Sequence, residues 1–114
     1  MSYETNPYYQ PEATGLKIIG TVEDPEACWT FKTLVVWTDG KRLLWATDSG
    51  CSCPTPFDDV EPIPATKPEI YRAIDAWVDS VSEYRDHQTR VEAQRDALIL
   101  KAKVREWRRG VSHA

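Results

Sequence analysis

The sequence predicts an α+β domain in which a small antiparallel sheet of about three strands precedes one long C-terminal helix. The dipeptide Asp39-Gly40 separates two β-rich runs, residues 28–38 and 41–48, and this pattern is a strong signal for a β-hairpin. From Glu69 to Arg109 the chain contains neither glycine nor proline, which favours an uninterrupted helix.

The 114 residues are expected to form one domain with three consecutive segments. Residues 1–15 carry two prolines and three tyrosines, which indicates an irregular arm that packs on the body or serves as a binding epitope. Residues 16–65 are expected to form the sheet and a stiff connector rich in cysteine and proline. Residues 66–110 are expected to form the long helix.

A two-residue loop at Asp39-Gly40 predicts the register of the hairpin. Thr38 then pairs with Lys41, and Trp37 pairs with Arg42, where a cation–π contact is possible. One face of the hairpin takes Leu34, Val36, Leu43 and Trp45, and the other takes Phe31, Val35, Trp37, Leu44 and Ala46. Since both faces are apolar, we expect other parts of the protein to cover both sides of the sheet.

The helix is expected to begin after Thr66, because Thr66 and Glu69 fit a capping box and Pro68 is tolerated in a first turn. Apolar residues then recur every seven positions, and this repeat favours one helix of about 60 Å. The repeat consists of Ile70, Trp77, Tyr84, Val91 and Leu98. The alternative is a pair of helices, the second of them capped by Thr89 and Glu92.

The three cysteines could lie close together, because the extrapolated register pairs Cys28 with Cys51 and places Cys53 on the same face. Three cysteines without the usual zinc spacing make a metal site less favoured. The chain shows no export signal, which argues against a disulfide, and acidic neighbours argue against a reactive thiolate. The preferred interpretation is reduced, buried cysteines at a tight corner, with no metal and no cofactor.

The sequence lacks the common catalytic motifs: a glycine-rich phosphate loop, G-x-S-x-G and H-E-x-x-H. We therefore expect a protein that is not an enzyme. No apolar run approaches the roughly 20 residues of a membrane helix, and the polar N-terminus has no secretory apolar region. A cytoplasmic location is expected.

Charge is distributed unevenly along the chain. Residues 1–84 carry six basic and fourteen acidic side chains, whereas residues 85–114 carry eight basic and four acidic ones. The basic part could bind acidic groups of its own or another copy, or a nucleic acid. The candidate nucleic-acid residues are Arg90, Arg95, Lys101, Lys103, Arg105, Arg108 and Arg109.

A helix of this length would extend beyond a three-stranded sheet, so its distal apolar residues need a cover. A protein partner, a second copy or a fold-back of the helix could supply it, and self-association is the preferred hypothesis. The residues concerned are Leu98, Ile99, Leu100 and Trp107.

Three stretches, NPYYQPEATGLKIIG, FKTLVVW and LLWATDSGCSCPTPF, carry a family resemblance over roughly residues 5–60. On these stretches the sequence resembles small uncharacterised proteins of actinobacteriophages and actinobacteria that share an SGCSCPxPF motif. The resemblance implies a phage or prophage accessory protein that acts inside the bacterial host, and such proteins often bind a host factor. It transfers no catalytic residues.

Overall fold

The computed structural model describes residues 6–9, 11–25, 30–51, 57, 60–83 and 85–109. In these residues four strands and two α-helices follow a short 3₁₀ turn, η2. Their bounds are η2 Pro11–Thr14, β1 Lys17–Glu23, β2 Thr30–Thr38, β3 Leu43–Cys51, β4 Ile63–Ala65, α1 Lys67–Ser82 and α2 His87–Glu106.

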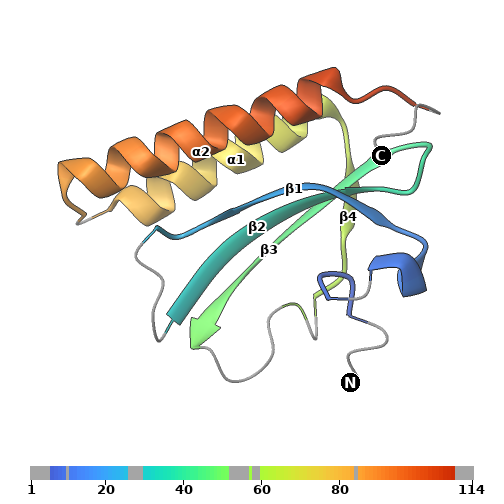
Figure 1. Cartoon of the computed structure of the whole chain (residues 1–114), viewed down its shortest axis with the longest axis horizontal. Coiled ribbons are helices and arrows are strands. Elements are labelled where there is room, and N and C mark those ends of the chain that lie inside the picture. The colour runs from blue at the N-terminus through green and yellow to red at the C-terminus, as the bar shows by residue number, and fades with distance from the viewer. Residues whose placement is uncertain are drawn as a thin grey trace.

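The strands form one antiparallel sheet in the order β1-β2-β3-β4. Both helices lie side by side on one face of this sheet, and the N-terminal segment with η2 lies on the opposite side (Figure 1). The predicted α+β class and the antiparallel meander are confirmed. The prediction of about three strands missed β4, a three-residue strand within the proline-rich connector.

The register of the β2–β3 hairpin differs from the predicted one by two residues. Thr38 pairs with Leu43, and Val36 pairs with Trp45, so the loop spans residues 39–42. Because side chains alternate with a period of two, this shift leaves every residue on the face to which it was assigned. The side chain of Phe31, which was assigned to the face of Val35 and Trp37, lies outside the described part of the structure.

Hydrogen bonds of Asp39 explain the longer loop. Its Oδ1 accepts from the backbone N–H groups of Lys41 and Arg42, at 2.9 Å each, and Gly40 adopts a φ of +93°. The Nε of Arg42 lies 3.0 Å from Oδ2 of Asp39, while Trp37 is buried and pairs with Leu44. The predicted contact between Trp37 and Arg42 is therefore wrong.

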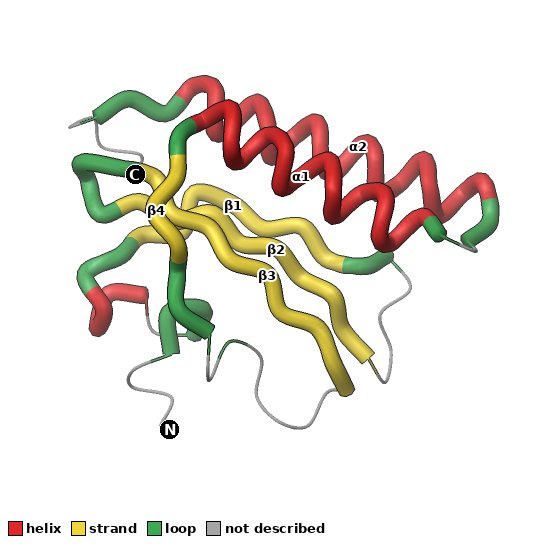
Figure 2. The backbone as a smooth tube through the Cα atoms, turned by 180° about the vertical axis from the view of Figure 1, so that it is seen from behind, coloured by secondary structure: helices red, strands yellow, loops and turns green. Residues whose placement is uncertain are grey.

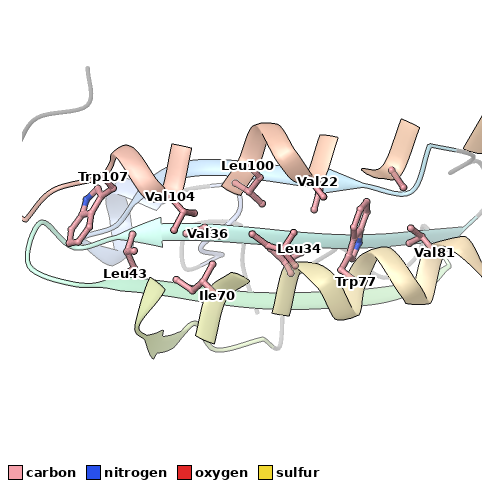
Figure 3. Close-up of a cluster of buried hydrophobic side chains, with 13 residues drawn as sticks. Val22, Leu34, Val36, Leu43, Ile70, Trp77, Val81, Leu100, Val104 and Trp107 are labelled. Carbon is pink, nitrogen blue, oxygen red and sulfur yellow. The ribbon is translucent and has the colours of Figure 1, made fainter. Parts of the chain in front are cut away.

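Both faces of the sheet are covered, as its two apolar faces predicted. The helices cover the face of Leu34 and Val36 (Figure 3). On the other face Trp37 and Phe57 pack edge to face with ring centroids 5.9 Å apart, and Trp37 Nε1 donates to the carbonyl of Pro7 at 2.8 Å. The described part of the N-terminal arm thus packs on the body of the protein.

The single long helix predicted for residues 66–110 is wrong, because the chain reverses after Ser82 and continues as α2 (Figure 2). The Thr66 capping box is confirmed. The second helix is capped by Asp86, whose side chain accepts from the N–H of Thr89 at 2.8 Å. The alternative of two helices was correct, but its proposed cap at Thr89 was not.

The reversal also changes which residues of the second helix are buried. The seven-residue repeat holds through α1, where Ile70 and Trp77 are buried, but Val91 and Leu98 are exposed. A different set of α2 residues packs against the rest of the protein, where α2 lies over β1. The fold-back thus buries apolar side chains that would be exposed on an extended helix. This set is Thr89, Ala93, Ala97, Leu100 and Val104.

Candidate functional site

A groove runs between α1 and the edge of the sheet formed by β3 and β4. Two adjoining cavities, of about 420 Å³ and 380 Å³, share Trp45 and Ala73 in their walls. The first is also lined by Lys32, Thr47, Asp48, Ser49, Ala76, Trp77 and Ser80, and the second by Ile63, Pro64, Ala65, Glu69 and Arg72.

β4 is short and pairs with only the first part of β3. β4 pairs only with residues 43–45 of β3, which itself continues to Cys51. Within the described ranges no strand pairs with the outer edge of residues 46–51. Three consecutive residues, 47–49, line the first cavity. Because alternate side chains of a strand point to opposite faces, the backbone edge itself must border the groove.

The floor of the groove is apolar. Trp45 is partly buried against the core, and Trp77 is almost completely buried, with its Nε1 donating to the carbonyl of Lys32 at 3.2 Å. Ala73 and Ala76 lie one turn apart on α1, and their small side chains leave the volume between the helix and Trp45 open. An inserted apolar side chain would therefore contact two indole rings.

One cation lies at the end of the groove near Ser80. Lys32 Nζ donates to Ser80 Oγ, and Ser49 pairs with Lys32 across the strands. The nearby carboxylate of Asp48 instead accepts from the backbone N–H of Ser49 and from that of Phe57, at 2.9 Å and 2.8 Å. Phe57 belongs to the core on the opposite face, so the Asp48 side chain is held on the face of β3 away from Lys32.

The predicted partner residues separate into two pairs. Leu98 and Ile99 are 66% and 52% exposed on α2, whereas Leu100 and Trp107 are buried in the protein's own core. The fold-back of α2 accounts for the burial of the second pair, which leaves these two side chains inaccessible to a partner.

The basic residues of α2 have different surroundings along the helix. Lys101 binds Asp75 of α1, and Arg90 Nε donates to the backbone carbonyl of Arg85 at 3.1 Å. Arg95 lies 3.9 Å from the carboxylate of Asp96. The remaining four candidates are exposed near the end of α2: Lys103, Arg105, Arg108 and Arg109.

The cysteine corner is only partly described. Cys51 ends β3 opposite Thr30, so the predicted register partner, Cys28, was wrong. Cys28 and Cys53 themselves lie outside the described residues. Among the residues that the structure does describe, no cluster of three or more His, Cys, Asp or Glu side chains could hold a metal ion.

Sequence reasoning missed the groove. One signal in the sequence was a set of small residues along one side of the predicted helix: Ala73, Ala76 and Ser80. Small residues in such a row are equally compatible with ordinary helix packing. A second signal was Ile63, which begins the short strand β4. The prolines on both sides of Ile63 argued against a strand at this position.

Comparison with known proteins gives a family and no further match. No curated protein and no solved structure matches the chain. In the described part of the chain no helix is long and apolar enough to cross a membrane. A family model described as a domain of unknown function (DUF7574) matches residues 5–108. This match covers most of the 114 residues, and the chain therefore belongs to the DUF7574 family.

Proposed function

We propose that this protein is a non-catalytic module that binds a partner protein by accepting an extended segment along the outer edge of β3. The observation that supports this proposal is that residues 47–49 of β3, with which no described strand pairs on the outer side, border a groove with an apolar floor. In strand addition, backbone hydrogen bonds give affinity, and pockets for alternate side chains give specificity.

The lining of the groove indicates the chemistry of the segment. An apolar side chain of the added strand would rest on Trp45 and Trp77, beside the small residues of α1. A carboxylate two positions along the strand would project to the same side and approach Lys32. The preferred segment therefore alternates apolar and acidic residues on the side that faces α1.

The biological setting of this binding is also a proposal. The resemblance to actinobacteriophage and actinobacterial proteins supports a phage or prophage accessory role inside the host cell. A protein of the host is then the natural source of the extended segment. The exposed side chains of Leu98 and Ile99 on α2 are available for a second contact, including self-association.

A displayed library of random peptides tests the proposed binding directly. Selected peptides are expected to carry an apolar and an acidic residue two positions apart. Replacing the exposed Ala76 by arginine fills the groove and should weaken their binding at least about tenfold, a loss of about 1.4 kcal/mol. The matched control is Ala13→Arg on η2, which lies across the sheet from the helices and should leave binding unchanged.

Chemical modification of the peptide distinguishes strand addition from simple insertion of a side chain. N-methylation removes a backbone donor, and methylation at the bonding positions should abolish binding, while the intervening positions should tolerate it. Equal tolerance at every position would contradict strand addition. Selected peptides that bind Ala76→Arg as well as the unmodified protein would contradict the groove as the binding site.

A further inference from the structure

One end of the molecule gathers basic side chains from four separate parts of the chain. Lys17 begins β1 and lies opposite Thr38, next to the hairpin loop that holds Lys41 and Arg42. The C-terminal end of α2 reaches this same end of the sheet (Figure 1). We call this surface the basic end; it comprises Lys17, Lys41, Arg42, Lys67, Lys103, Arg105, Arg108 and Arg109.

Specific contacts hold these segments together. Lys67, the first residue of α1, donates from Nζ to the carbonyls of Arg105 and Trp107 at 2.7 Å and 2.8 Å. Trp107 belongs to the same buried cluster as Leu43, the first residue after the hairpin loop, and Figure 3 shows the two side chains at one end of the sheet. The basic end is therefore assembled by tertiary contacts between separate segments and is not confined to the C-terminal residues.

Acidic groups at the basic end are fewer and partly engaged. Four carboxylates lie in these segments and in η2, against eight cations: Glu12, Asp39, Glu69 and Glu106. Asp39 accepts from backbone N–H groups and from Arg42, and Glu69 accepts from Thr66 in the capping box. These eight cations and four carboxylates sum to +4, on a protein whose total charge is −4. Lys103 lies at the margin of the basic end, where it also lines a cavity with Glu23, Asp24 and Asp96.

The C-terminus of α2 does not offset this positive charge. Helix C-termini carry a partial negative charge on their free carbonyl groups. Here Lys67 donates to two carbonyls of the last turn and its exit, and the N–H of Trp107 donates to the carbonyls of Lys103 and Val104 at 3.2 Å each. These donors occupy carbonyl groups at the helix end that would otherwise be free.

The residue types at the basic end fit a polyanion better than a protein surface. The exposed large apolar side chains of the described residues are Tyr9, Ile63, Val91, Leu98 and Ile99. None belongs to the basic end, whereas protein interfaces are organised around apolar or aromatic anchors. Arginine, which supplies four of the eight cations, presents a planar fork of donors that matches phosphate oxygens.

We propose that the basic end binds the phosphate backbone of a nucleic acid through charge, without reading its base sequence. This inference is independent of the groove between α1 and β3, since none of the eight cations lines the two cavities of that groove. The acidic remainder of the protein opposes the approach of a polyanion, so binding is weak and sensitive to salt.

Fluorescence anisotropy with a labelled 20-base-pair duplex tests the proposal. If three phosphates are neutralised, affinity should fall about 40-fold between 50 and 200 mM salt. The double variant Arg108→Gln, Arg109→Gln should weaken binding about tenfold and reduce the slope of the salt dependence by about two. The matched control, Arg90→Gln with Arg95→Gln, removes two arginine charges from α2 outside the basic end and should change affinity less than about twofold.

A second pair of substitutions tests whether the fold assembles the surface. Lys17→Gln with Lys41→Gln removes charges far from the C-terminus in sequence, and should also weaken binding by about fivefold or more. An unchanged affinity would place binding in the C-terminal residues alone and overturn the assembled surface. The absence of binding at 50 mM salt, an equal loss in the control pair, or equally tight binding of polyglutamate would each overturn the assignment to nucleic acid.

Discussion

Gly20 of β1 lies against Leu100 of α2 so closely that a Cβ at position 20 would be 2.8 Å from Cδ1 of the leucine. The pairing of β1 with β2 also shifts between Ile18 and Gly20. The missing side chain lets the second helix settle on the edge strand. This contact closes the helical layer over the sheet, because Leu100 is almost fully buried.

We expect Gly20→Ala to destabilise the protein by about 1–3 kcal/mol, the usual cost of overpacking a core. Urea unfolding measures this loss. In the background of Leu100→Ala, which costs about 2–5 kcal/mol by itself, the same change at position 20 should cost little, because the clashing methyl group is gone. Additive losses in this double-mutant cycle would contradict the close contact as the cause.

Asp86 should make the stability of the helical pair depend on pH. The backbone N–H of Thr89 donates to the Asp86 carboxylate and lowers its pKa below the ordinary value of 3.8. Since the pKa is lower in the folded state, the stabilisation is present above 3.8 and is lost as the pH falls through the folded-state pKa. Asp86→Asn keeps an acceptor for the cap but cannot titrate.

The difference in unfolding free energy between the wild type and Asp86→Asn should therefore shrink on acidification from about pH 7 to about pH 2. Asp86→Ala removes the cap and should lower the melting temperature at both pH values. A constant difference between wild type and Asp86→Asn across this range would show that the charge of Asp86 does not stabilise α2.

Gly40 offers a test of backbone conformation without packing. Its φ is +93°, and a Cβ at this position would have no other atom within 4 Å. Gly40→Val should then cost about 1–2 kcal/mol through conformational strain alone. Gly40→Asn should cost clearly less, because asparagine tolerates positive φ better. Equal melting temperatures for wild type and Gly40→Val would contradict the loop geometry.

Local patterns in the sequence predicted the elements well where one interaction dominates. Thr66 and Glu69 form the expected capping box, and the alternation of residues 34–37 placed each side chain on its correct face. The predicted register was wrong by two residues, because the Asp39 side chain accepts hydrogen bonds from backbone N–H groups of its own loop and so stabilises a longer loop. The alternation of apolar and polar residues therefore predicts the face on which a side chain lies more reliably than the residue with which it pairs.

The reversal of the helix and the groove depend on contacts between distant residues. A seven-residue repeat continues through Leu98, and only the packing of Ala93, Ala97 and Leu100 on the sheet reveals a second repeat with a different phase. The basic end likewise depends on the pairing of Lys17 with Thr38 beside the hairpin loop and on the hydrogen bonds from Lys67 to the carbonyls of Arg105 and Trp107. Secondary-structure propensity and hydrophobic periodicity carry no information about which distant segments pack together.

The exposed pair Leu98 and Ile99 leaves a large apolar area on α2 after its other face is buried. Exposed acidic residues on α1 and beyond its end include Asp79 and Glu83, whereas Asp75 is bound to Lys101 of the same chain. A second copy could therefore bring its acidic α1 against the basic surroundings of this pair, so that apolar burial and charge attraction act together. We therefore propose self-association as the use of the predicted partner surface.

Sedimentation velocity at tens of micromolar should accordingly detect dimers or larger assemblies that dissociate as salt is raised, because the charge contribution is screened. Leu98→Asp should shift the distribution to monomer, since it places a carboxylate in the apolar contact. Gln94→Asp adds the same charge about one turn away at another exposed position and should have a smaller effect. A wild-type protein that sediments strictly as a monomer, with Leu98→Asp indistinguishable from it, would leave this surface free for a different protein.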